Sequence, residues 1–109
     1  MADAIEQPGK PTVQPVQHTR LLPMWNVILI DDNDHTYDYV IEMLINLFGH
    51  TLERGFHTAR VVDKEGRAVV FTGHREVAEL KLEQIQGFGI DPRIASCRGS
   101  MNAVLEPAE

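Results

Sequence analysis

Three aspartates and one asparagine lie where an apolar segment gives way to a helical pattern. Asp31, Asp32, Asn33 and Asp34 follow directly on the apolar residues 27–30. Carboxylates at such a junction can bond nearby backbone amides, bind a metal ion, or accept hydrogen bonds from an organic cation. The residues around the junction favour some of these uses over others.

A solvated turn is the simplest interpretation, because Asp and Asn side chains commonly bond backbone amides in turns. A calcium loop is a second interpretation. Asp31, Asn33 and Glu42 match the first, third and twelfth positions of an EF-hand loop. However, Thr36 stands where the sharp turn requires glycine, and the helical pattern of residues 37–48 would hold Glu42 away from the loop. The spacing therefore disfavours calcium.

Histidine and cysteine offer no clear metal site or catalytic centre. Five histidines occur without a paired spacing on one helix face, which a zinc site would need. They are His18, His35, His50, His57 and His74. The single cysteine, Cys97, adjoins Arg98, yet no sequence feature pairs its thiol with a base. The sequence also lacks a glycine-rich phosphate loop and a nucleophile elbow. We therefore expect no catalytic residue, no metal and no cofactor.

A site for a free α-ammonium group is the third interpretation of the acidic junction. This group is a compact cation with three hydrogen-bond donors, and carboxylates bind such cations through charge-assisted bonds. The apolar face of the helix that follows could hold the side chain carried by the same α-carbon. An acidic mouth beside an apolar pocket would read the first residue of a protein chain.

Charge and composition exclude several classes of protein. The 109 residues carry a net charge of −6 and no basic stripe, which argues against nucleic-acid binding. One cysteine cannot form an internal disulfide, and this fits a reducing compartment. No signal pattern begins the chain, and no apolar run approaches about 18 residues. We expect a cytoplasmic protein that contacts neither nucleic acid nor membrane.

Hydrophobic periodicity predicts one folded core behind a flexible extension. Residues 1–22 are polar and rich in proline, so we expect an extension there and a core over residues 23–109. Strands are predicted at 24–30, 67–72 and 101–107, and helices at 36–48, 51–66 and 74–88. The order β-α-α-β-α-β indicates an α+β fold, a three-stranded sheet with three helices on one face.

Apolar stripes predict which helix faces are buried. Thr36 and Thr51 are expected as N-caps, and Gly49 and Gly66 as stops. The first helix would bury Tyr37, Val40, Ile41, Leu44 and Phe48. The second would bury Leu52, Phe56, Ala59 and Val62 or Asp63. The third would bury Val77, Ala78, Leu82, Ile85 and Phe88. Gly55 inside the second helix costs about 1 kcal/mol relative to alanine.

These segments resemble the ClpS family, the bacterial and plastid adaptors of Clp proteases. The resemblance rests on "VILIDDNDHTYDYVIEMLINLF", "LERGFHTARVVDKEGRAVV" and "EVAELK", and residues 24–86 align without a gap. It implies a monomeric adaptor rather than an enzyme, with an antiparallel sheet like that of the ribosomal stalk protein's C-terminal domain. Such adaptors bind proteins whose first residue is bulky and hydrophobic. They dock on the N-terminal domain of a ClpA- or ClpC-type AAA+ unfoldase, and their N-terminal extension takes part in delivery.

The resemblance also assigns roles to individual positions. The α-amino group of the ligand would meet Asp31, Asp32 and Asp63. The hydrophobic pocket would be lined by Leu29, Ile30, His35, Tyr37, Val40, Ala59, Val62 and Met101. The surface facing the unfoldase would include Glu76 and Lys81. Core packing is the ordinary alternative for the pocket residues, and for Leu29 and Ile30 the two roles are equally favoured.

Several positions depart from the family pattern. The departures are Asp31 for asparagine, Asp63 for histidine, His35-Thr36 for Thr-Pro, Tyr37 and Ala59 for methionines, and an insertion over 89–100. Three ionised carboxylates around one ammonium would repel one another in the free protein. We expect N-terminal recognition with altered preference. The alternatives are a docking module that has lost recognition, a metal-dependent hydrolase, and a ribosome-associated module.

Overall fold

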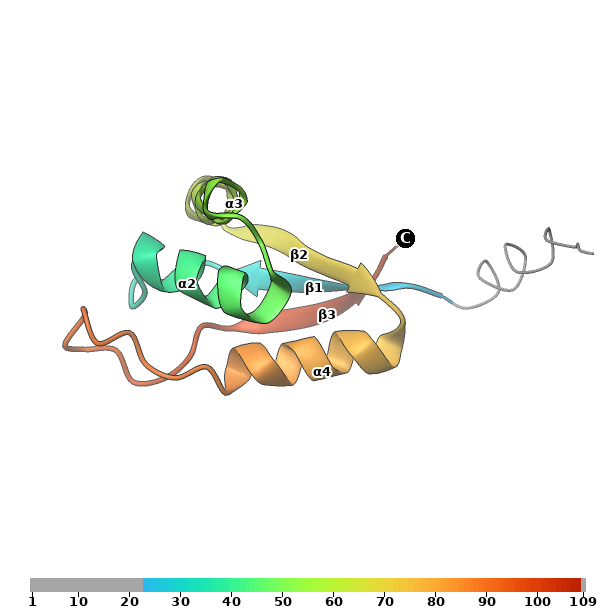
Figure 1. The fold of residues 1–109 in the computed structure, drawn as a ribbon. Helices are drawn as coiled ribbons and strands as arrows, with labels where there is room; N and C mark the ends of the chain where they lie inside the picture. The colour runs from blue at the N-terminus through green and yellow to red at the C-terminus, as the bar shows by residue number, and fades with distance from the viewer. Residues whose placement is uncertain (1–22, 109) are drawn as a thin grey trace, which may run out of the picture.

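The structure, a computed structural model, describes residues 23–108 (Figure 1). The elements are β1 Trp25–Ile30, α2 Tyr37–Phe48, α3 Leu52–Glu65, β2 Arg67–Gly73, α4 Arg75–Gln86 and β3 Ala103–Pro107. Their order is the one predicted from periodicity. The extension expected over residues 1–22 lies outside the described residues. Within the described part, no helix has both the length and the apolar character needed to cross a membrane.

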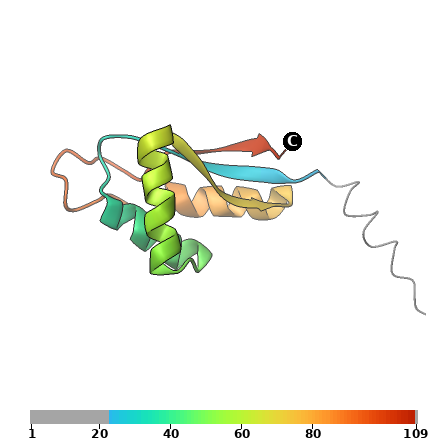
Figure 2. The same ribbon diagram turned by 90° about the horizontal axis from the view of Figure 1, so that it is seen from above.

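The three strands form an antiparallel sheet in the order β2-β1-β3, with β1 in the centre. Helices α2 and α4 lie on one side of this sheet, and α3 runs across its β2 edge (Figure 2). Val27 and Leu29 of β1 are fully buried within the core under the helices. Ile28 points to the other face, where it pairs with residues of both neighbouring strands. The predicted α+β fold class is therefore confirmed.

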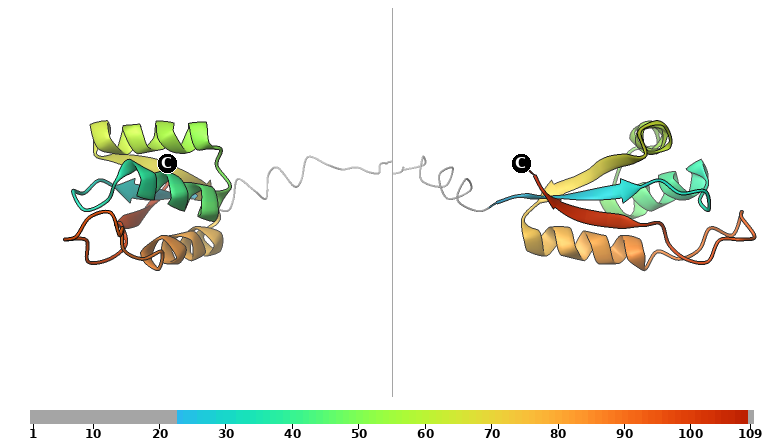
Figure 3. Two further views of the ribbon diagram at one scale, coloured as in Figure 1. Left: turned by 60° about the vertical axis from the view of Figure 1, so that its left-hand side comes forward. Right: turned by 180° about the vertical axis from the view of Figure 1, so that it is seen from behind.

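Helix α2 lies between α3 and α4 and is buried on more than one side (Figure 3). Thr36 caps it by accepting a hydrogen bond from the backbone N–H of Tyr39 at 3.1 Å. Gly49 ends it in the left-handed conformation, with a φ of 69°. Of the predicted stripe, Val40, Ile41 and Leu44 are buried, whereas Tyr37 and Phe48 are half-buried. Tyr39 and Met43 are buried as well, because neighbours cover both flanks of the helix. A single-stripe pattern did not predict this second buried face.

The predicted buried face of α3 is wrong at its N-terminal end. Leu52 and Phe56 are 67% and 46% exposed, whereas Gly55 and Ala59 are buried. The buried stripe starts at Gly55 because this residue allows α2 to approach closely. A Cβ atom at position 55 would lie 3.3 Å from Cγ2 of Ile41. The helix-propensity cost of glycine is thus offset by close packing of two helices.

Helix α4 packs across all three strands through a narrow stripe. Ala78 and Ile85 are fully buried, and Leu82 and Phe88 pack against the core from partly exposed positions. Val77 was predicted to join them, but it is 43% exposed. Its position lies off the stripe that the i, i+4, i+7 spacing of 78, 82 and 85 defines.

Candidate functional site

The acidic junction forms the turn between β1 and α2. The backbone N–H of Asp31 donates to the carbonyl of Gly66 at 3.0 Å, which ties this turn to the end of α3. The Asp31 side chain is exposed, whereas Asp32 is half-buried. Oδ1 of Asp32 accepts from the backbone N–H of Asp34 at 2.9 Å. The solvated-turn interpretation therefore accounts for part of this cluster, but not for all of it.

His35 connects this turn to the segment that precedes β3. Its Nδ1 lies 2.8 and 2.9 Å from the two carboxylate oxygens of Asp32. Its Nε2 lies 2.8 Å from the carbonyl oxygen of Gly99. The side chain is only 3% exposed, and its ring centroid lies 4.5 Å from that of Tyr39. His35 was predicted to line a pocket. Its ring joins an acid of the turn to the inserted segment.

Tyr37 connects the start of α2 to α3. Its hydroxyl donates to Oδ2 of Asp63 at 2.8 Å, and its ring packs against Phe56 with centroids 5.7 Å apart. The hydrogen bond to Asp63, together with burial, raises the pKa of Tyr37 above its usual 10.0. The charge of Asp31 adds to this rise, and that of Arg60 opposes it. Charges from both sides of the junction thus act on one hydroxyl group.

The apolar residues predicted to line the pocket meet behind these polar contacts. Five of them are buried in one cluster between the sheet and the helices, namely Leu29, Val40, Ala59, Val62 and Met101. Ile30 is half-buried at the end of β1. Its backbone N–H donates to Asn102 at 3.0 Å. The set is therefore brought together in space, and its members pack against one another as core residues.

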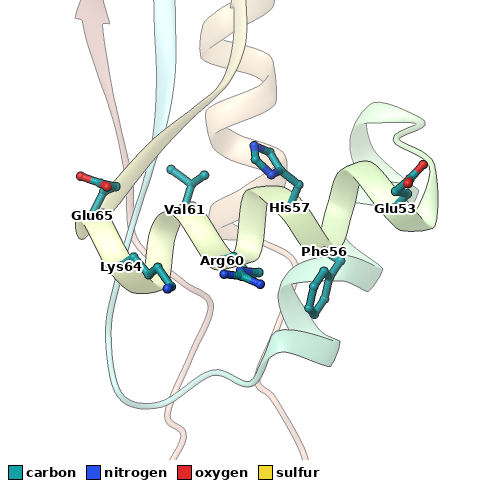
Figure 4. Close-up of a pocket in the computed structure, with 7 residues that line it drawn as sticks. All are labelled: Glu53, Phe56, His57, Arg60, Val61, Lys64 and Glu65. Carbon is teal, nitrogen blue, oxygen red and sulfur yellow. The ribbon is translucent and has the colours of Figure 1, made fainter.

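The surface has one hollow along α3 and another at the start of α4. One is lined by Glu53, Phe56, His57, Arg60, Val61, Lys64 and Glu65. Figure 4 shows Phe56, Arg60 and Lys64 on one side of α3, with His57 and Val61 on the opposite side. A second hollow joins Trp25 to the start of α4. Basic and acidic side chains alternate along α3, so its hollow has no single charge.

Asp91, in the inserted segment, is a fully buried carboxylate. Burial alone would raise its pKa. Hydrogen bonds from the backbone N–H groups of Thr36 and Arg93, the Thr36 hydroxyl and the Arg93 guanidinium outweigh burial and hold the pKa at about 2. Arg93 also donates to Glu42 at 2.7 Å. The sequence signal was the Asp-Pro-Arg turn, in which an Asp side chain accepts from the backbone two residues on.

The same contacts bear on the calcium interpretation. Glu42 lies on α2 and pairs with Arg93 rather than folding towards Asp31 or Asn33. Among residues 23–108, no group of three or more histidine, cysteine, aspartate or glutamate side chains is arranged to hold a metal ion. The acidic junction is organised by hydrogen bonds within the protein instead.

Cys97 lies closer to a base than its sequence neighbours indicated. Its Sγ is 3.4 Å from Nε2 of His35 and accepts from the backbone N–H of Asp91 at 3.2 Å. The thiol donates to the carbonyl of Gly99 at 3.3 Å. Cys97 is buried at 9% exposure, so a substrate could not reach the sulfur without movement of the inserted segment.

The two residues predicted to face an unfoldase lie differently. Glu76 is exposed in the first turn of α4, at the hollow beside Trp25. Lys81 is half-buried, and its Nζ donates to the carbonyl of Leu47 at 2.7 Å. A cation there satisfies a free carbonyl near the C-terminal end of α2. Lys81 therefore fastens α4 to α2, while Glu76 remains available at the surface.

Comparison with known proteins agrees with this architecture. Residues 21–91 match the family model described as "ATP-dependent Clp protease adaptor protein ClpS". The chain is similar in fold to the solved structure of Agrobacterium tumefaciens ClpS2 bound to L-phenylalaninamide. The TM-score is 0.67 at 22% sequence identity, and the match covers 78% of this chain and 96% of that chain.

Curated relatives carry the same family description. The ClpS adapter of Desulforapulum autotrophicum is 33% identical over 63 residues, which cover 58% of this chain and 61% of that protein. The match thus spans about three-fifths of that relative. The ClpS adapter of Campylobacter jejuni is 31% identical over 77 residues, covering 69% of this chain and 80% of that protein. This chain therefore belongs to the ClpS family of adaptors of ATP-dependent Clp proteases.

Proposed function

We propose that this protein binds the N-terminal residue of substrate proteins and delivers them to a Clp-family unfoldase. One observation carries the proposal: the Asp63 carboxylate accepts a hydrogen bond from the Tyr37 hydroxyl at 2.8 Å, beside the turn of the acidic junction and a buried apolar cluster. An α-ammonium group at that point would receive charge-assisted hydrogen bonds. The side chain of the same residue would extend towards Val40, Ala59 and Val62.

Binding requires Tyr37 to move. In the free protein its hydroxyl occupies an acceptor position of Asp63, and its ring rests on Phe56 at the exposed edge of α3. An arriving ammonium offers Asp63 a charged donor in place of a neutral one, which favours the exchange. Displacement of the ring would open a way to the small side chain of Ala59. Tyr37 thus acts as a latch in place of the methionine expected from the family pattern.

Unfoldase docking is the second part of the proposal. The exposed face at the start of α4 combines Glu76 with the exposed apolar residues Val77 and Leu80. The Arg75 guanidinium lies over the ring of Trp25 at 4.6 Å and extends this face to the first residue of the central strand β1. Lys81 contributes indirectly, because its bond to Leu47 fixes the position of α4. The partner would be the N-terminal domain of a ClpA- or ClpC-type unfoldase.

The test compares fluorescent peptides that begin with Leu, Phe, Tyr, Trp, Arg or Met. Each peptide is measured with a free and with an acetylated N-terminus. We expect at least one free peptide to bind more than about tenfold more tightly than its acetylated form, because acetylation removes the charge and two of the donors. Equal affinities across the whole series would eliminate N-terminal recognition.

A docking module without N-terminal recognition is the competing function. The close packing of the predicted pocket residues favours it, since none of the five buried members is open to solvent in the free protein. The two functions differ in one outcome. A docking module would bind the unfoldase domain and ignore every peptide, whereas an adaptor would bind both.

A further inference from the structure

We infer that His35 is held as an imidazolium ion paired with Asp32, so that Asp31 and Asp63 carry the charge that recognises an N-terminal amine. Asp32 would then shape the junction without attracting the ligand. The inference rests on the proposed function for the role of Asp31 and Asp63. The protonation of His35 stands on geometry alone and can be tested without any ligand.

Both ring nitrogens of His35 face atoms that accept hydrogen bonds. Nδ1 lies within 2.9 Å of both oxygens of Asp32, and Nε2 lies 2.8 Å from the Gly99 carbonyl oxygen. A carbonyl oxygen only accepts, and so does an ionised carboxylate. A neutral imidazole has a single N–H and could satisfy one of these partners. Donation to both requires a hydrogen on each nitrogen, which is the imidazolium form.

The other groups around His35 leave Asp32 as its anionic partner. Cys97 lies 3.4 Å from Nε2, but its thiol donates to Gly99 and therefore keeps its hydrogen. The Tyr39 ring flanks the imidazole, and the Tyr39 hydroxyl donates to the carbonyl of Gly89. Asp91 is another buried acid of the inserted segment, but its two oxygens accept hydrogen bonds from Thr36 and Arg93.

The same contacts argue against a catalytic role for the Cys97 thiol. Cys97, His35 and Asp32 follow one another as a nucleophile, a base and an orienting acid would. A base needs a free lone pair on the nitrogen that faces the thiol. Here Nε2 lies 2.8 Å from the Gly99 carbonyl oxygen, which only accepts hydrogen bonds, and the sulfur is buried. The geometry therefore serves charge pairing rather than proton abstraction.

Charge pairing resolves a difficulty that three acids at one site would create. Three ionised carboxylates would repel one another before the ligand arrives. An imidazolium within 2.9 Å of Asp32 cancels most of the field of that carboxylate at the mouth. Two acids then remain for one ammonium group. The histidine comes from the position where the family pattern has threonine, so this device depends on residues particular to this chain.

Nitrogen-15 NMR of the full chain tests the protonation directly. We expect both ring nitrogens of His35 to carry hydrogen under the conditions of the peptide-binding measurements. A neutral tautomer of His35 under those conditions would overturn the inference. This experiment uses no peptide, so its outcome is independent of whether the protein reads N-terminal residues.

Three charge-removing variants test the division of labour. Asp63→Asn should weaken free peptides by about tenfold or more, since it removes a charge that faces the ammonium. Asp32→Asn should weaken them by less than about threefold, because His35 loses its proton when its anionic partner is removed and the net charge of the pair stays at zero. Asp34→Asn removes the same unit of charge from the same turn and serves as the control. Equal losses for Asp32→Asn and Asp63→Asn would overturn the inference. If neither variant weakens binding and acetylated peptides bind as tightly as free ones, the proposed function is rejected instead.

Discussion

Asp91 accepts hydrogen bonds from both the backbone N–H and the hydroxyl of Thr36, each at 2.8 Å. Thr36 is the N-cap of α2, so one buried carboxylate fixes the inserted segment to the helix that follows the acidic junction. An anion at a helix N-terminus also interacts favourably with the helix dipole. The inserted segment is thus part of the architecture of the site.

Replacing Asp91 with asparagine should destabilise the protein by about 2 to 3 kcal/mol, because the buried network loses its negative charge and one of its two acceptor oxygens. The free energy of unfolding in urea measures this loss. Asp38→Asn is the matched control, since Asp38 is exposed and lies 3.8 Å from the same arginine. The control should change stability by less than about 0.5 kcal/mol. Equal effects for the two variants would contradict the account.

Asp91 should also make the stability of the protein depend on pH in the acid range. The pKa of Asp91 falls from 3.8 to about 2 on folding, so its contribution to stability is fully present above pH 3.8. It is lost as the pH falls through about 2, and the loss amounts to about 2 kcal/mol. Between pH 5 and 2, the free energy of unfolding should therefore fall more steeply with decreasing pH for the native chain than for Asp91→Asn. Parallel curves would show that Asp91 does not titrate in this way.

Removing the Tyr37 hydroxyl should release the latch. In Tyr37→Phe the ring remains against Phe56, but Asp63 no longer accepts from a neutral donor. We expect free N-terminal peptides to bind about two- to fivefold more tightly, because no hydrogen bond has to be exchanged. Fluorescence anisotropy measures the change, and acetylated peptides should be unaffected. Weaker binding of the free peptides would mean that the hydroxyl contacts the ligand.

Reversing the charge of Glu76 should separate docking from recognition. Glu76→Lys changes an exposed residue at the start of α4, which is a different element from the turn that holds the acids. It should weaken binding to an unfoldase N-terminal domain by about tenfold or more if the interface is charge-complementary. Peptide affinity should not change. A variant that loses peptide binding and retains docking would contradict this assignment of surfaces.

Local patterns predicted the elements well because their signals are local. Thr36, Thr51, Gly49 and Gly66 act at the helix ends as predicted, since capping depends on a few adjacent residues. The buried face of α3 was mispredicted because Gly55 has no hydrophobic signal. Its role appears only when Ile41 of the neighbouring helix is in place.

The site was predicted less completely, because its key contacts span long stretches of sequence. The bond between Tyr37 and Asp63, and that between His35 and Gly99, join residues that periodicity treats separately. Asp91 was overlooked because a buried carboxylate and a loop carboxylate look the same in a sequence. The family pattern placed the acids and the apolar residues in one region. It could not tell which acid a neighbouring cation neutralises.

A crystal structure with a peptide that begins with Leu or Phe would show where the chain terminus binds. We expect the α-ammonium nitrogen within hydrogen-bond distance of Asp31 and Asp63, with the Tyr37 hydroxyl displaced and the first side chain beside Ala59. A peptide seated elsewhere on the surface, with the bond between Tyr37 and Asp63 intact, would contradict it.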